Sequence, residues 1–138
     1  YILYRGGSTA TTGVSNMGRK EQFVTVIQEL RENVPDVTGV MIASIDGLAI
    51  ATDFPEEEAA RVAAMSASAV GLGNRITKTT QLGEMFDMMI EGDNELLIIY
   101  MAGPGAILAV RAPRRANLGL IRLEGPKSAR KTAELVLA

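Results

Sequence analysis

Three short segments that are apolar on both of their alternating faces constrain the fold of this chain most strongly. Residues 38–44, 96–102 and 106–112 consist mainly of aliphatic, methionine and small side chains. Each segment has the length of a strand, and a strand that is apolar on both faces belongs in the middle of a sheet that is covered on both sides. The chain must therefore supply helices for both faces of one sheet.

Helical spacing appears around these strands. Apolar residues recur at i, i+3, i+4 and i+7 from Phe23 to Leu30 and predict a helix over residues 19–33. That helix ends there because Pro35 disfavours helical geometry in the residues just before it. A second helix is predicted over residues 55–79, because a proline followed by three acidic residues suits the positive end of a helix dipole.

The resulting order is helix, two strands, helix, three strands and helix, within a length of 138 residues that fits one domain. With the most apolar strands at the centre, this α/β (α+β) sandwich has a five-stranded antiparallel sheet of order 2-1-5-4-3, with helices on both faces. The third strand then forms an exposed edge.

Gly125-Pro126 predicts a kink or break in the last helix, because proline removes a helical hydrogen bond. The predicted elements cover residues 19–33, 38–44, 48–52, 55–79, 84–91, 96–102, 106–112 and 117–138.

The first sixteen residues have a different character from the rest. Residues 1–16 are rich in Ser, Thr and Gly without periodicity, which predicts a flexible or loosely docked N-terminal arm. The domain itself is predicted over residues 17–138, and Met17 is an alternative start. No apolar run approaches the roughly 20 residues that a membrane span needs, so we expect a cytoplasmic protein without membrane contact.

The residue types that are missing exclude several kinds of chemistry. The sequence has neither cysteine nor histidine. A cysteine nucleophile, a Cys/His zinc site, a Ser-His-Asp triad and imidazole acid–base catalysis are therefore ruled out. We expect no catalytic residue, no cofactor and no metal. The net charge of −2 does not by itself suggest a nucleic-acid partner.

The helix predicted over residues 55–79 carries two apolar stripes. The stripe with the larger side chains fits a sheet face, whereas the other has mostly small side chains and would let another helix approach closely. Together with the exposed edge strand, the small stripe predicts a two-fold dimer with one continuous sheet. Two methionines on the edge strand suit either the core or an adaptable interface. The larger stripe is Val62, Met65, Ala69, Leu72 and Ile76, and the predicted interface is Ala60, Ala63, Ala67, Val70, Asn74, Met85, Asp87 and Met89.

Three further motifs have simpler structural explanations. Residues 73–79 end in Lys-Thr, but Thr77 stands where a phosphate-binding loop needs glycine, so an exposed helix face is the favoured interpretation. The acidic residues 56–58 are explained by the helix N-terminus. A late basic cluster without interleaved aromatic residues is best explained as a solvated face. That cluster is Arg111, Arg114, Arg115, Arg122, Lys127, Arg130 and Lys131.

The order and spacing of several short pieces resemble the Roadblock/LC7 family of dynein light-chain-like and MglB-like domains. The resemblance extends from about Glu21 to the end of the chain, and an unbroken last helix would be the family's pattern. It implies a homodimer, or a heterodimer with a paralogue, that binds a small Ras-like GTPase and has no catalytic residues of its own. The matching pieces are Gly39-Val40, residues 44–48, residues 59–69, Glu91-Gly92 and residues 117–122.

The favoured hypothesis is a non-enzymatic dimeric regulator or scaffold that binds a small Ras-like GTPase, with a GTPase-activating or adaptor role. Arg61 is then a candidate GTPase contact, on the helix that carries the small stripe. A second hypothesis is a small-molecule sensor, since α/β/α sandwiches of this size hold ligands between sheet and helix. A hydrolase or transferase that uses Ser, Lys and carboxylates is a third, for which no pair of residues has persuasive spacing.

Overall fold

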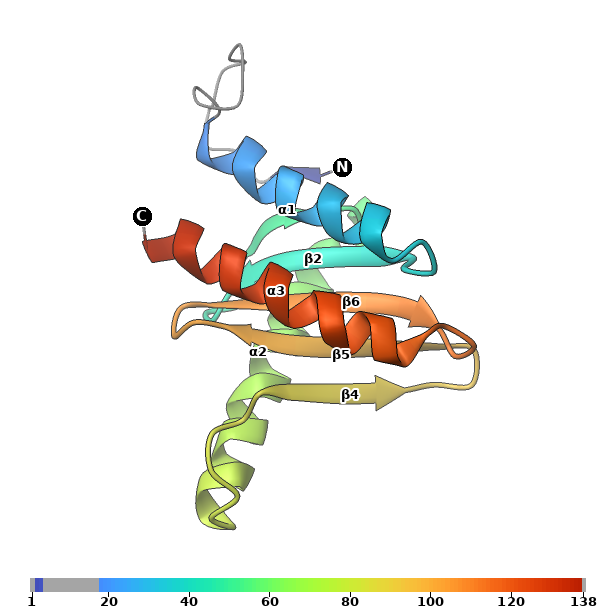
Figure 1. Ribbon diagram of the computed structural model, residues 1–138. Helices are drawn as coiled ribbons and strands as arrows, with labels where there is room; N and C mark the ends of the chain where they lie inside the picture. The colour runs from blue at the N-terminus through green and yellow to red at the C-terminus, as the bar shows by residue number, and fades with distance from the viewer. Residues whose placement is uncertain (1, 4–17, 138) are drawn as a thin grey trace.

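A computed structural model describes residues 2–3 and 18–137 of the chain. One antiparallel sheet separates two helices on one face from a single helix on the other (Figure 1). Most of the predicted N-terminal arm falls outside the described residues. The elements are β1 (Ile2–Leu3), α1 (Arg19–Asn33), β2 (Gly39–Ser44), β3 (Ala49–Thr52), α2 (Glu56–Thr79), β4 (Asp87–Glu91), β5 (Glu95–Ala102), β6 (Ala106–Pro113) and α3 (Leu118–Leu137).

The sheet confirms the predicted topology. Its order is β1-β3-β2-β6-β5-β4, which for the five predicted strands is 2-1-5-4-3. The apolar strands β2, β5 and β6 occupy the centre, where both of their faces are covered. The strand β1 was not predicted; it pairs with the outer strand β3 through Ile2 opposite Thr52 and Leu3 opposite Ala51.

Two cores lie on the two faces of the sheet. On one face, α1 and α3 cover side chains of β2, β5 and β6, including Ile42, Ile98 and Leu108. On the other face, α2 covers the alternate side chains of the same strands, including Ile99 and Ile107. This alternation explains why each central strand is apolar at nearly every position.

The turn between β2 and β3 brings this hairpin against α2. Gly47 has a φ of +94°, a conformation that favours glycine, so the predicted Asp46-Gly47 turn is confirmed. A Cβ atom at Gly47 would lie 3.2 Å from the Cα of Ala64 and 3.6 Å from the Cβ of Ala67. The turn therefore needs small residues on the neighbouring flank of α2.

A kink or break was predicted at Gly125-Pro126, and the structure shows that the helix does not break there. The helix α3 runs uninterrupted from Leu118 to Leu137 with Pro126 inside it. A proline costs about 3 kcal/mol in a regular helix. Burial of the α3 face against the sheet outweighs that cost, because Ile121 is fully buried and Gly125 lies directly over the ring of Tyr100.

The predicted orientation of α2 is also wrong. The residues that α2 buries are Ala59, Ala63, Ser66, Val70 and Gly73, so the face against the sheet consists mostly of small residues. The larger stripe, which was expected to face the sheet, is instead largely exposed: Met65 is 62%, Leu72 58% and Ile76 51% exposed. Small residues allow the helix to lie close to the sheet, and the C-terminal end of α2 projects beyond β4 (Figure 1).

Candidate protein-interaction surface

The strand β4 is an open edge of the sheet. It pairs with β5, from Asp87 opposite Tyr100 to Glu91 opposite Leu96, and no other described strand pairs with it. Its backbone N–H and C=O groups on the outer side are thus available to another strand. The side chains of Met89 and Ile90 are 37% and 50% exposed, so the edge is apolar as well as open.

Gly73 of α2 allows the helix and the start of β4 to pack closely together. A Cβ atom there would lie 2.6 Å from both the Sδ of Met85 and the Cε of Met88. The two methionines therefore fill the space that the missing side chain leaves, and they hold the start of β4 against the projecting part of α2. As a result, the exposed side of α2 and the open edge of β4 form one surface.

We define the α2/β4 surface by its exposed apolar residues. On α2 these residues are spaced by seven and four positions, so they lie on one side of the helix. Exposed apolar residues on a monomer become informative when they form one contiguous patch beside an unpaired strand edge. The α2/β4 surface consists of Met65, Leu72, Ile76 and Ile90, the β4 residue whose side chain lies on the α2 face of the sheet.

A groove of about 570 Å³ lies between the first half of α2 and the start of β5. Its floor is apolar and includes Val62, Met65, Ile90 and Leu97. Two of these residues belong to the α2/β4 surface, so the groove is continuous with it. Arg61 lines the groove from α2; it is exposed, and its Nη2 donates to the carbonyl oxygen of Glu57 at 3.4 Å.

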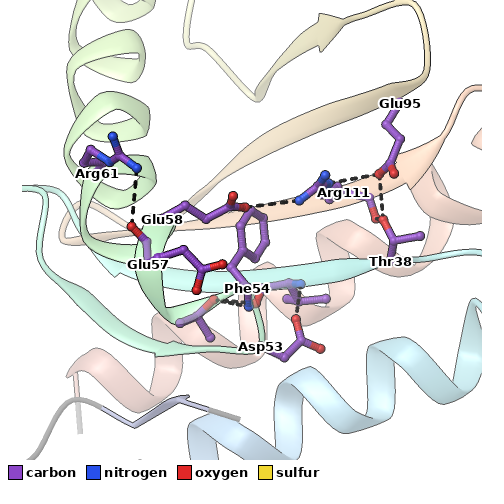
Figure 2. Close-up of polar contacts among 10 residues, drawn as sticks. Thr38, Asp53, Phe54, Glu57, Glu58, Arg61, Glu95 and Arg111 are labelled. Carbon is purple, nitrogen blue, oxygen red and sulfur yellow. Dashed lines mark hydrogen bonds and ion pairs between the residues drawn. The ribbon is translucent and has the colours of Figure 1, made fainter.

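A network around Arg111 closes the other end of the groove (Figure 2). The Nε of Arg111 donates to Glu95 Oε1 at 2.9 Å, and its Nη1 donates to Glu58 Oε1 at 3.2 Å. The guanidinium carbon of Arg111 lies 5.9 Å from the centre of the Phe54 ring, within the range of a cation–π contact. The network ties the first turn of α2 to β5 and β6, so it fixes one wall of the groove.

The carboxylate of Glu95 is shared between two donors. The hydroxyl of Thr38 donates to Oε1 at 2.9 Å, the same oxygen that accepts from Arg111. These contacts, with that of Thr38 the largest, lower the pKa of Glu95 below its ordinary value of 4.5, although partial burial acts in the opposite direction. The carboxylate therefore remains charged where it holds β2, β5 and β6 together at this end of the sheet.

The start of α2 is fixed by the residue that precedes it in the chain. Asp53 accepts a hydrogen bond from the N–H of Val40 at 2.7 Å and forms an ion pair with Arg31 of α1. The hydroxyl of Thr52 accepts from the N–H of Phe54 at 2.9 Å (Figure 2). These contacts connect β2, α1 and the first turn of α2, so the helix leaves the sheet in one defined direction.

The predicted interface residues are distributed over three environments. Ala63 and Val70 are fully buried against the sheet of their own chain, which leaves them no surface for a partner. Ala67 and Asn74 are partly buried, and Ala60 is exposed. Met85 lies against α2 at Gly73, whereas Met89 is exposed and pairs opposite Ile98, whose side chain belongs to the α1/α3 core. Asp87 forms an ion pair with Arg122 at 3.2 Å.

The exposed stripe on α2 was not predicted from the sequence. A signal for it was present, because the tight turn at Gly47 requires small neighbours and thus places Ala64 and Ala67 towards the hairpin. The large residues Met65 and Leu72 must then point away from it. The pattern alone did not reveal that the C-terminal end of α2 projects beyond β4.

The other sequence motifs lie where they were expected. Residues 73–78 lie within α2 and Thr79 ends it, so no phosphate-binding loop follows a strand there. Residues 56–58 form the first turn of α2, with Glu58 bound to Arg111. The described residues contain no group of three or more acidic side chains placed to hold a metal ion, and within the same part of the chain no helix is long and apolar enough to cross a bilayer.

The basic cluster is largely compensated by neighbouring carboxylates. Six of its seven cations have an ion-pair partner among the described residues, and Arg130 is the one member of the cluster that has none there. Exposed pairs of this kind contribute little to stability, but they cancel the local positive field. The pairs are Arg111 with Glu58 and Glu95, Arg114 with Glu91, Arg115 with Asp36, Arg122 with Asp87, Lys127 with Glu124 and Lys131 with Glu29.

The fold and this surface define a small α+β domain with an open strand edge beside an exposed apolar helix. The chain belongs to the Roadblock/LC7 domain family, whose model matches residues 24–112. Two uncharacterized proteins of Methanocaldococcus jannaschii are each 35% identical to it over 96 residues, which is 69% of this chain and 83% of each relative.

Several solved structures have a similar fold. A Roadblock/LC7 domain from Streptomyces avermitilis superposes with a TM-score of 0.77 at 24% identity and covers 83% of this chain and 97% of its own. Myxococcus xanthus MglB gives a TM-score of 0.77 at 19% identity, with 84% of this chain and 95% of that chain covered. The gliding protein MglB from Thermus thermophilus gives 0.76 at 17% identity, with 86% and 91% covered.

Proposed function

We propose that this chain is a non-enzymatic regulator or scaffold that dimerises through the α2/β4 surface and, as a dimer, binds a small Ras-like GTPase. The observation that supports it most directly is the contiguous exposed apolar patch of Met65, Leu72 and Ile76 beside the unpaired edge of β4. Family membership supports the GTPase as partner, because binding of such GTPases is what the Roadblock/LC7 resemblance implies.

The open edge and the projecting helix suit a second copy of the chain or a paralogue. Pairing β4 with its symmetry mate would satisfy the free backbone groups and continue the sheet across the two-fold axis. The exposed stripe of each α2, with Met65, Leu72 and Ile76, would then face the other chain beside the paired strands. Apolar surface would be removed from water on both molecules by the same contact.

The GTPase is assigned to the outer side of the paired α2 helices. Ala60 and Arg61 are exposed on the first half of α2, and the guanidinium of Arg61 contacts only a backbone carbonyl among the described residues. It is thus free to meet an acidic group of a partner. The absence of histidine and cysteine from the sequence agrees with a role in which the GTPase supplies the catalytic groups for hydrolysis.

The direct test is binding to each small Ras-like GTPase of the source organism, loaded with GDP or with a non-hydrolysable GTP analogue. We expect one GTPase to bind in one nucleotide state, and the variant Arg61→Glu to weaken that binding by at least about tenfold. The variant Lys78→Glu, which changes an exposed cation at the far end of α2, is the matched control.

A hydrolysis assay on the same complex separates an activator from a scaffold, since only an activator raises the rate of phosphate release. Uniform absence of binding across both nucleotide states would count against a GTPase regulator. If the wild-type chain were also monomeric, the small-molecule sensor would become the better hypothesis.

A further inference from the structure

A second groove lies on the opposite face of the sheet from α2, between α3 and the start of β4. One flank of α3 packs on α1, where Lys131 pairs with Glu29 at 3.1 Å. The other flank faces β4 and leaves a groove of about 550 Å³. Neither the proposed dimer contact of the α2/β4 surface nor the proposed GTPase contact at Arg61 uses it.

The floor and walls of this groove are mainly apolar. The ring of Tyr100 lies at its base and is 3% exposed, and Pro126, Ala129 and Ala133 line the α3 side. The two alanines are what make the groove hollow, because a larger side chain at either position would occupy it. Phe86 stands at the mouth and is 83% exposed, the most exposed of the large apolar side chains among the described residues.

The charges around the groove are unbalanced at one point. At one end, Asp87 is already paired with Arg122. Farther along α3, Arg130 lines the groove, is exposed, and has no carboxylate partner within the part of the chain that the structure describes. All the other cations of the basic cluster are paired, so Arg130 is a single free guanidinium beside an apolar channel.

The apolar lining and the free cation together indicate which class of ligand would bind in this groove. A purely apolar ligand would make no use of the exposed guanidinium of Arg130. A nucleic acid or an anionic membrane would need a row of free cations, and the neighbouring Lys127 and Lys131 are already paired with carboxylates. A peptide that places one bulky apolar side chain over Tyr100 and a carboxylate against Arg130 satisfies both the apolar floor and the free charge.

We infer that the α3/β4 groove docks a short acidic, apolar peptide segment of a partner protein. The partner is distinct from the GTPase, and its site lies on the other face of the sheet from α2, so both can be held at once. Such an arrangement is what a scaffold requires, and it does not depend on which GTPase, if any, occupies the α2 side.

The test uses the full chain and a random dodecapeptide library displayed on phage. Selected peptides should share an acidic residue close to a bulky apolar residue. The best of them, synthesised with a fluorescent label, should bind the wild-type chain saturably in an anisotropy titration. Arg130→Glu should weaken that binding by at least about tenfold, since a charge-assisted hydrogen bond contributes on that order. Ala133→Leu, which fills the groove, should weaken it similarly.

Two controls keep this result specific. Arg75→Glu changes an exposed cation of α2 on the other face and should leave the affinity within about twofold. A peptide in which each acid is replaced by lysine should not bind. Circular dichroism checks that each variant is folded, and Arg130→Glu, which alters an exposed side chain, remains informative if Ala133→Leu does not fold. No enriched peptide, or equal weakening by Arg75→Glu and Arg130→Glu, would overturn the assignment.

Discussion

At the scale of single residues, Gly125 acts by the space that its missing side chain leaves for Tyr100. An alanine normally stabilises the interior of a helix relative to glycine by about 1 kcal/mol. At Gly125 the sign should reverse, because a Cβ atom would lie 2.6 and 2.8 Å from two ring carbons of Tyr100 and 2.9 Å from its hydroxyl oxygen. We expect Gly125→Ala to lower the free energy of unfolding by about 1–3 kcal/mol in urea denaturation.

Gly71 provides the matched control for this substitution. It lies inside α2, is exposed, and has no atom within 4 Å of where its Cβ would stand. Gly71→Ala should therefore raise the free energy of unfolding by about 0.5–1 kcal/mol. If both variants are stabilised, close contact between α3 and Tyr100 is not what requires a glycine at position 125.

The carboxylate of Glu95 gives a pH dependence with a definite sign. Because Thr38 and Arg111 lower its pKa in the folded chain, the stability it contributes is present above the ordinary value of 4.5 and is lost as pH falls through the lower folded value. Glu95→Gln should therefore be less stable than the wild type at pH 7, and the difference should shrink below about pH 4.5. Urea denaturation of both proteins at several pH values measures this difference in the free energy of unfolding. A difference that does not change with pH would contradict a stabilising role for the charged Glu95 carboxylate.

At the scale of elements, the sequence was sufficient for the type, order and pairing of the five main strands and three helices. The strands that are apolar on both faces were predicted to lie in the centre of the sheet, and Asp46-Gly47 was predicted to form a turn; both predictions are confirmed. Two features depended on tertiary contacts instead. Pro126 stays inside α3 because packing on Tyr100 holds the helix together, and the rotation of α2 follows from its small residues at the sheet and from its length beyond β4.

The candidate site was less predictable for the same reason. A stripe of large residues and a stripe of small ones on one helix do not reveal which is covered until the sheet beneath is known. The open edge at β4 was predicted from strand character, because its alternating pattern distinguishes it from the central strands. The Arg111 network was not predicted, since Thr38, Glu58 and Glu95 are far apart in sequence and no local pattern relates them.

The orientation of α2 can be tested by placing the same charge on its two sides. Val70 is fully buried whereas Leu72, two residues later, is 58% exposed. Val70→Asp should lower the free energy of unfolding by more than about 3 kcal/mol, because it buries an unpaired carboxylate. Leu72→Asp should change it by less than about 1 kcal/mol when measured at a concentration too low for association to contribute. Equal destabilisation would mean that α2 packs with a different face on the sheet.

At the scale of the whole molecule, β4 lies between two surfaces that serve different contacts. On the α2 side, the α2/β4 surface is assigned to a second chain. On the α3 side, the groove beneath Arg130 is assigned to an acidic peptide. A dimer built on β4 would bring two such peptide grooves to the same central region of one continuous sheet. Association of the chain should therefore be separable from peptide binding by variants on opposite faces.

The dimer itself is tested by the solution mass at micromolar concentration, measured by light scattering. The wild type should have twice the mass of the chain, and Leu72→Arg should be monomeric, because it places a charge in the centre of the exposed stripe on α2. Leu48→Arg is the control. Leu48 is 71% exposed but lies at the β2–β3 turn, outside the α2/β4 surface, so the Leu48→Arg variant should keep the mass of the dimer. If Leu72→Arg stays dimeric while Ala60→Arg dissociates, the contact lies on the small-residue side of α2, and the large stripe would then be left for the GTPase.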